Sequence, residues 1–179
     1  MERSGTRSPE LAGAIVEHLM RRHSTATVLF HHAVAERLGI GPTDHKCLDL
    51  LRERGAMTGS ELAATTGLTS GAVTVAVARL ERAGYLHREP DPHDRRKQVL
   101  SPAPERTAEI HAALAPIRRD VAALLGQFDE HQLGAIATFL EGTAALLYRN
   151  SALLRVEPAH TPVRGEAVPL TRPRVRSRG

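Results

Sequence analysis

Apolar residues recur at helical spacing in three long stretches of the chain. In residues 9–38, 105–126 and 130–149 they fall three or four positions apart, which places them on one face of an α-helix. The first stretch is followed by two glycines and Pro42, which are typical of a helix end. We therefore predict one long N-terminal helix and two long C-terminal helices, with Asp129 capping the last.

Three shorter helical patterns lie between these stretches. Thr43 is predicted to cap the first of them. Thr58 and Glu61 have the spacing of a capping box, so a short helix begins there and ends at Gly67. Thr69 can cap the third. The predicted helices span residues 43–54, 58–66 and 70–83. The predicted inward-facing residues of the first are Cys47, Leu48, Leu50 and Leu51.

The spacing of apolar residues changes at Tyr85. The stretches YLHRE (85–89) and KQVLS (97–101) have an extended pattern, and they flank the loop PDPHDRR. Two such stretches around a polar loop predict a β-hairpin. Pro90 and Pro92 are expected to stiffen the loop and to exclude regular strand pairing inside it.

This order of elements predicts a mainly α-helical protein with a small β-hairpin wing, that is, a winged helix-turn-helix flanked by long dimerisation helices. The short central block is too small to cover the apolar faces of all the long helices, so these helices pack together or pair with another chain. The predicted segments are a flexible N-terminus (1–8), an N-terminal dimerisation helix (9–42), a winged helix-turn-helix DNA-binding domain (43–103), C-terminal dimerisation helices (104–150) and a disordered, basic, Pro/Arg-rich tail (151–179).

Charge and composition narrow the class of protein further. The net charge is +4, but residues 150–179 hold six Arg and two Glu, so residues 1–149 are formally neutral. Bulk charge is therefore no evidence that the folded part binds nucleic acid, and a local arrangement must supply it. The sequence contains no apolar run of transmembrane length, no signal peptide and only one cysteine, Cys47. We expect a cytoplasmic protein with no membrane partner.

The helix over 70–83 has one local arrangement suited to DNA. Val73, Val77 and Leu80 share a stripe and are predicted to be buried. The opposite face lacks the charges usual on a solvent-exposed helix, and its small side chains permit close approach to the major groove. The residues predicted to face DNA are Ser70, Gly71, Thr74, Val75 and Arg79.

The loop EPDPHDRRKQ (89–98) has a second such arrangement. Arg95 and Arg96 stand at its tip, where a guanidinium group can enter a narrow minor groove. Asp91 and Asp94 by themselves repel DNA, so we expect them to brace the wing, with one of the two acids orienting an arginine through a bidentate salt bridge. The alternative is a solvated charge cluster, whose exposed ion pairs are worth only about 0–1 kcal/mol each.

Two stretches resemble the MarR family of transcriptional regulators. They are ELAATTGLTSGAVTVAVARLERAGYL (61–86) and DPHDRR (91–96), and the second is similar to the family's DPxDRR wing signature. The resemblance covers about residues 9–150. It implies an obligate homodimer that binds a double-stranded, pseudo-palindromic operator, commonly as a repressor. It also implies release from DNA by a small-molecule effector or an oxidant.

The resemblance also implies roles for single positions. Thr74 matches a position that commonly faces DNA, and Arg95 or Arg96 matches the wing arginine. Val75 and Ala78 stand where relatives often carry basic, polar or acidic residues. Specificity is therefore expected to depend more on the wing and on DNA shape than on direct base contacts.

An effector pocket is a further implication of the resemblance. Its lining is expected to come from helices 9–38, 43–54 and 105–126, and its ligand is unknown. Cys47 is predicted to be a buried structural thiol. No cofactor, metal site or enzymatic activity is predicted, since the histidines of the first helix (His18, His23, His31 and His32) form no i, i+4 pair beside an acidic residue and no catalytic motif is present. A zinc site formed only in the fold is the alternative.

Two other functions fit the same patterns. One is a constitutive or architectural DNA-binding protein without an effector. The other is a helical dimerisation module in which the charged hairpin is only a turn. Charge reversal at Arg95 and Arg96 distinguishes the DNA-binding hypotheses from the last one.

Overall fold

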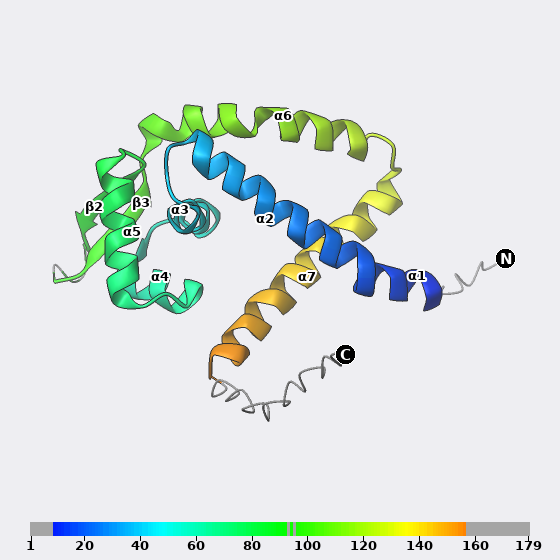
Figure 1. Ribbon diagram of the computed structural model, residues 1–179, viewed down its shortest axis with the longest axis horizontal. Helices are drawn as coiled ribbons and strands as arrows, with labels where there is room; N and C mark the ends of the chain where they lie inside the picture. The colour runs from blue at the N-terminus through cyan, green and yellow to red at the C-terminus, as the bar shows by residue number, and fades with distance from the viewer. Residues whose placement is uncertain (1–8, 93, 95, 157–179) are drawn as a thin grey trace, which may run out of the picture.

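The computed structural model describes residues 9–92, 94 and 96–156. Its α-helices are α1 (Pro9–Ala14), α2 (Met20–Arg37), α3 (Pro42–Arg54), α4 (Gly59–Thr66), α5 (Ser70–Arg82), α6 (Thr107–Leu125) and α7 (Glu130–Val156). Its strands are β1 (Met57–Thr58), β2 (Leu86–Pro90) and β3 (Gln98–Pro102). Figure 1 shows a lobe made of α3, α4, α5 and the sheet, from which α2 and α6 extend. The predicted fold class is confirmed.

The long predicted helices are present, with two differences from the expected pattern. The N-terminal helix is interrupted by a π-helical segment (Ile15–Leu19) between α1 and α2. Asp129 begins α7 as predicted, because its carboxylate accepts a hydrogen bond from the backbone of Gln132 at 2.8 Å. However, α7 continues to Val156, so the predicted start of the tail at residue 151 is too early. The predicted flexible N-terminus and the rest of the tail lie outside the described residues.

The predicted helix starts in the lobe are confirmed at two of three places. Thr58 and Glu61 form a reciprocal capping box at α4, and Thr69 caps α5. The prediction for Thr43 is wrong: α3 begins one residue earlier with Pro42, after Gly41 in an extended conformation. Proline suits the first position of a helix because it lacks the N–H group that would have no partner there.

The β-hairpin is confirmed, and a third strand joins it. The strand order is β1-β3-β2, with antiparallel pairs such as Met57↔Leu100 and Leu86↔Pro102. Pro90 was expected to lie outside regular pairing, but it ends β2 opposite Gln98. The edge position of β2 tolerates a proline, since one side of an edge strand has no ladder partner.

The hydrophobic core lies inside the lobe. Leu51, Leu62 and Leu80, from three different helices, have no exposed surface, and the inward face predicted for α3 is confirmed. The hydroxyl of Tyr85 lies 3.1 Å from the carbonyl oxygen of Leu38 and 3.0 Å from a carboxylate oxygen of Glu109. These contacts join the lobe to the end of α2 and the start of α6.

The helix α7 returns to the lobe through polar contacts. The Tyr148 hydroxyl donates a hydrogen bond to the Glu53 carboxylate at 2.7 Å. The guanidinium group of Arg155 donates to the carbonyl oxygens of Thr65 and Thr66, each at 2.9 Å. These carbonyls end α4, where a cation is favoured by the helix dipole. None of the described helices has the length and apolarity needed to span a membrane.

Candidate nucleic-acid interface

The helices α4 and α5 and the turn between them form the helix-turn-helix unit. Gly67 ends α4 with a φ of +75°, a backbone conformation that glycine adopts without strain. The Thr69 hydroxyl then accepts a hydrogen bond from the backbone of Ala72 at 3.2 Å. Leu62 and Leu80 are fully buried, so both helices are anchored in the core. The start of α5 is thereby held at the surface.

The two faces of α5 divide as predicted. Val73, Val77 and Leu80 are at most 3% exposed, whereas Val75 on the opposite face is 51% exposed. The small side chains of the outer face leave the helix backbone accessible to a groove of DNA. All five residues predicted to face DNA are exposed: Ser70, Gly71, Thr74, Val75 and Arg79.

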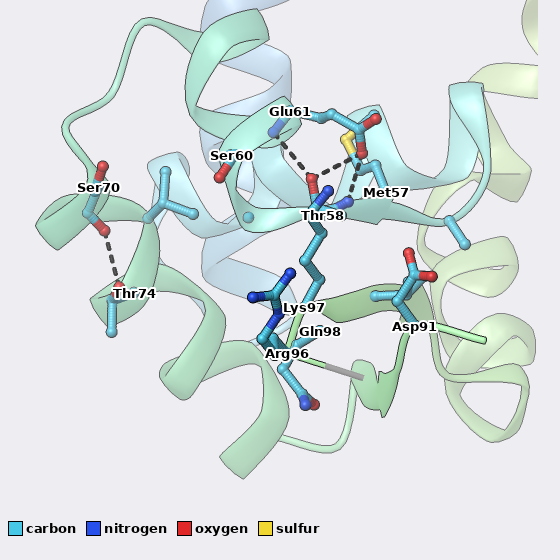
Figure 2. A pocket seen from close by; sticks show the side chains of 14 residues that line it. Met57, Thr58, Ser60, Glu61, Ser70, Thr74, Asp91, Arg96, Lys97 and Gln98 are labelled. Atoms are coloured by element: carbon cyan, nitrogen blue, oxygen red, sulfur yellow. Dashed lines mark hydrogen bonds between the residues drawn. The ribbon is translucent and has the colours of Figure 1, made fainter. Parts of the chain in front are cut away.

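A groove of about 840 Å³ separates the start of α5 from the wing. Figure 2 shows Ser70 and Thr74 on one side of it and Arg96 and Lys97 on another, with the start of α4 between them. The Thr74 hydroxyl donates to the carbonyl oxygen of Ser70 at 2.8 Å. Its oxygen therefore keeps acceptor capacity toward the groove.

Hydrogen bonds inside the wing hold its charged residues in place. A carboxylate oxygen of Asp91 accepts from the backbone N–H of Asp94 at 3.0 Å. A carboxylate oxygen of Asp94 accepts from both the backbone N–H and the Nε of Arg96, each at 3.2 Å. The Arg96 side chain is 91% exposed, so its other donors face solvent. Arg95 lies outside the described residues.

Lys97 is a basic residue of the groove that the sequence patterns did not single out. Its position directly after the two arginines of the loop was the available signal. The groove also contains Glu61, and hydrogen bonds from Thr58 lower the pKa of that carboxyl group. Glu61 is therefore ionised at neutral pH, and the groove has charges of both signs.

Arg79 contacts another helix of the lobe. Its Nε and Nη2 donate to the two carboxylate oxygens of Asp44, at 2.7 and 2.6 Å. Asp44 is 1% exposed, whereas the Arg79 side chain is 48% exposed. The pair joins α5 to the first turn of α3, which assigns Arg79 a structural contact besides its predicted DNA contact. The partners are 35 positions apart in the sequence, which explains why no local pattern indicated the pair.

A smaller cleft of about 330 Å³ lies between α2 and α3. Two of the three helices expected to line an effector pocket contribute to it, and the α4–α5 turn replaces α6 as the third element. Cys47 lines it and is buried, and burial, with the nearby charge of Asp44, raises the pKa of its thiol to about 11. Burial also lowers the pKa of His31 and of His45, against the opposing effect of Asp49.

The helix-turn-helix, the three-stranded sheet and the hairpin loop define a winged helix-turn-helix protein, the class that places a helix in the major groove of DNA. A sequence model of the MarR family matches residues 38–97. The HTH-type transcriptional regulator YcgE of Bacillus subtilis (strain 168) is 42% identical over 129 residues, covering 72% of this chain and 84% of that protein. This chain belongs to the MarR family, whose members are DNA-binding transcriptional regulators and not enzymes.

Solved structures share the fold at lower sequence identity. A MarR family protein from Bacillus stearothermophilus is 22% identical, with a TM-score of 0.61, and the match covers 78% of this chain and 98% of that one. A mutant of MepR from S. aureus is 19% identical, with a TM-score of 0.50, and the match covers 74% of this chain and 97% of that one. That MepR structure is of a complex with an oligodeoxyribonucleotide.

Proposed function

We propose that this MarR-family regulator represses transcription in the cytoplasm by binding a pseudo-palindromic operator as a homodimer, and that a small-molecule effector releases it. The groove between α5 and the wing carries the proposal. The exposed start of α5, with Ser70 and Thr74, is placed to enter a major groove. Arg96 and Lys97 then reach the phosphates or the adjacent minor groove. The DNA complex of MepR, which shares this fold, supports this mode of binding.

The apolar surface of the long helices supports the homodimer. Large apolar side chains are exposed on helices from both ends of the chain, including Val16 (66%), Leu29 (65%), Leu147 (65%) and Leu154 (70%). Monomeric proteins rarely expose large contiguous apolar patches. A second copy covers these faces and brings two α5 helices to one DNA molecule. Half-sites about one helical turn apart then fit the two-fold symmetry.

Charge reversal in the wing tests the DNA contact. We expect Arg96→Glu to weaken operator binding by at least about tenfold and to reduce the dependence of affinity on salt, because a phosphate-contacting cation is lost. Arg37→Glu, at the exposed end of α2, is the matched control and retains binding. The operator is first selected from a random DNA pool. No enrichment of any palindrome at low salt contradicts the proposal, as does unchanged binding by Arg95→Glu, Arg96→Glu and the double variant.

The cleft between α2 and α3 supports the effector. Its volume of about 330 Å³ is in the range of small-molecule sites, and apolar groups such as Val28 and Leu68 line it together with histidines. A thermal-shift screen of small organic acids and phenols is the test. A ligand at 100 times its dissociation constant adds about 2.7 kcal/mol to stability. We expect a stabilising ligand to release operator DNA. A ligand that stabilises without releasing DNA indicates a constitutive DNA-binding protein.

A further inference from the structure

Two histidines and an aspartate converge where α2 packs on α3. His31 lies on α2, and His45 and Asp49 lie one helical turn apart on α3. Each residue offers one candidate ligand atom, and these three atoms all lie within 4.8 Å of one another. The Nδ1 atoms of His31 and His45 are 3.2 and 3.5 Å from the same carboxylate oxygen, Oδ2 of Asp49.

Two of the three separations, those from each histidine to Asp49, are close to those expected between ligands of a tetrahedral zinc ion. Bonds from zinc to nitrogen and oxygen are about 2.0–2.1 Å long, so two ligand atoms at a tetrahedral centre lie about 3.3 Å apart. The distances of 3.2 and 3.5 Å to Asp49 fall on either side of this value. Two imidazoles and one carboxylate also form a ligand set that zinc uses in sites with an open fourth position.

His31 has an unsatisfied atom at this place. Its Nδ1 is buried and has no hydrogen-bond partner among the described residues, although Asp49 Oδ2 lies only 3.2 Å away. The short distance without a hydrogen bond means that the ring is not aimed at the oxygen. Buried polar atoms normally have a partner, and a cation held between His31 and Asp49 satisfies both groups.

An ion-pair cluster is the competing explanation. Lys46 Nζ and Arg52 Nη1 each lie 3.9 Å from the Asp49 carboxylate and neutralise part of its charge. However, the Lys46 side chain is 64% exposed and can move into solvent. Neither cation supplies a partner for His31 Nδ1. The ion pairs therefore account for Asp49 but not for the position of the histidine.

Two clefts give access to the cluster. The cleft of about 330 Å³ between α2 and α3 is lined by both His31 and His45. A second cleft, of about 530 Å³, is lined by His31 and Asp49 and extends to Tyr148 of α7. An ion can therefore enter, and a water molecule or another small ligand can complete its coordination.

We propose that His31, His45 and Asp49 bind one divalent transition-metal ion, best fitted by Zn²⁺, through one imidazole nitrogen of each histidine and one carboxylate oxygen. The ion joins α2 to α3 directly. Binding therefore stabilises the contact between the N-terminal helix and the lobe. This site does not depend on the proposed DNA binding.

A metal titration of the untagged, full-length, chelator-treated protein tests the site. Zn²⁺ is titrated in competition with a chromophoric chelator, and Co²⁺ reports tetrahedral coordination through its visible absorption. We expect one tight ion per chain. His31→Gln and Asp49→Asn are expected to weaken binding at least about 100-fold, since each removes one of three ligands. His23→Gln, which changes an exposed histidine elsewhere on α2 that lines neither cleft, is the matched control and keeps the affinity.

Thermal unfolding separates loss of the ion from loss of the fold. Without metal, the variants His31→Gln and His23→Gln are expected to have the helical circular dichroism spectrum of the wild type. Added Zn²⁺ raises the melting temperature of the wild type and of His23→Gln, and it leaves that of His31→Gln unchanged. Equal Zn²⁺ affinity in wild type, His31→Gln and Asp49→Asn overturns the proposal, as does a Co²⁺ complex without tetrahedral absorption.

Discussion

The lobe and the outer helices of this protein bury their apolar residues to very different extents. In the lobe, side chains such as Leu48 and Leu80 are at most 1% exposed, and helices and sheet enclose a common core. Along α6, only Ile110 is buried, and α7, all of whose residues are described, has no buried residue. Leu140 and Leu147 of α7 are 54% and 65% exposed.

The difference shows that the apolar helix faces of the two regions are covered in different ways. A helix with one apolar face is stable when that face is covered. In the lobe the covering elements come from the same chain. For α6 and α7 we infer that a second copy of the chain supplies them.

Acidic residues on the exposed apolar face of α7 test this inference most severely. We expect the double variant Leu140→Asp and Leu147→Asp to be monomeric, because carboxylates at the centre of an apolar interface lose their hydration. Light scattering coupled to size-exclusion chromatography measures the mass. The control His131→Asp adds an acid at an exposed site near the start of α7 and leaves the dimer intact. A wild-type protein that is monomeric at micromolar concentration contradicts the inference.

Truncation of a buried side chain tests the lobe, whose apolar faces are covered by the same chain. Leu80→Ala leaves a cavity at a fully buried position and is expected to lower the free energy of unfolding by about 3 kcal/mol. Urea denaturation at fixed protein concentration measures the loss. The matched variant Leu147→Ala weakens only the proposed dimer, so we expect it to lose stability at protein concentrations where the wild type is dimeric and to match the wild type on dilution below the dimer dissociation constant. Similar, concentration-independent losses in both variants contradict the distinction between the two regions.

The Arg79–Asp44 pair lies on α5, which packs against α3 and is proposed to contact DNA. Arg79→Met leaves the buried Asp44 carboxylate without its partner, so we expect a lower urea midpoint. Lys97→Met, in the groove, is expected to weaken DNA binding and to leave the midpoint unchanged. Gel-shift titration and urea denaturation of the same preparations separate the two effects. If Arg79→Met leaves the stability unchanged and weakens DNA binding, Arg79 contributes to DNA binding and not to the stability of the fold.

Removal of the capping box of α4 is expected to have the smallest effect on stability among these changes. Thr58→Ala removes the cap and is expected to cost about 1 kcal/mol at pH 7, whereas Thr65→Ala, on the same helix, is nearly neutral. Hydrogen bonds from Thr58 lower the pKa of Glu61 in the folded state. The ionised carboxylate therefore stabilises the fold at pH values above its unfolded pKa of about 4.3. This stabilisation is lost as the pH falls through the lower pKa of the folded state. Urea denaturation between pH 7 and pH 3 should therefore show the difference between wild type and Thr58→Ala shrinking at the acidic end.

Local signals in the sequence were sufficient for the starts of α4, α5 and α7 and for the division of the faces of α5, but not for the start of α3. Thr58, Thr69 and Asp129 act within one helical turn of their partners, so each cap is visible as a short spacing. The buried stripe of α5 follows from the helical period alone. The wing was predictable because a β-hairpin pairs neighbouring segments.

Contacts between distant segments were decided only by the tertiary structure. The two-residue strand β1 is too short to show a period, and its pairing with β3 depends on where the hairpin packs. Asp44 meets Arg79, and His31 meets Asp49, because separate helices pack side by side. The sequence by itself therefore determined the class of protein through its periods, caps and wing. The groove, the Arg79–Asp44 ion pair and the histidine cluster depend on long-range packing, which no local spacing encodes.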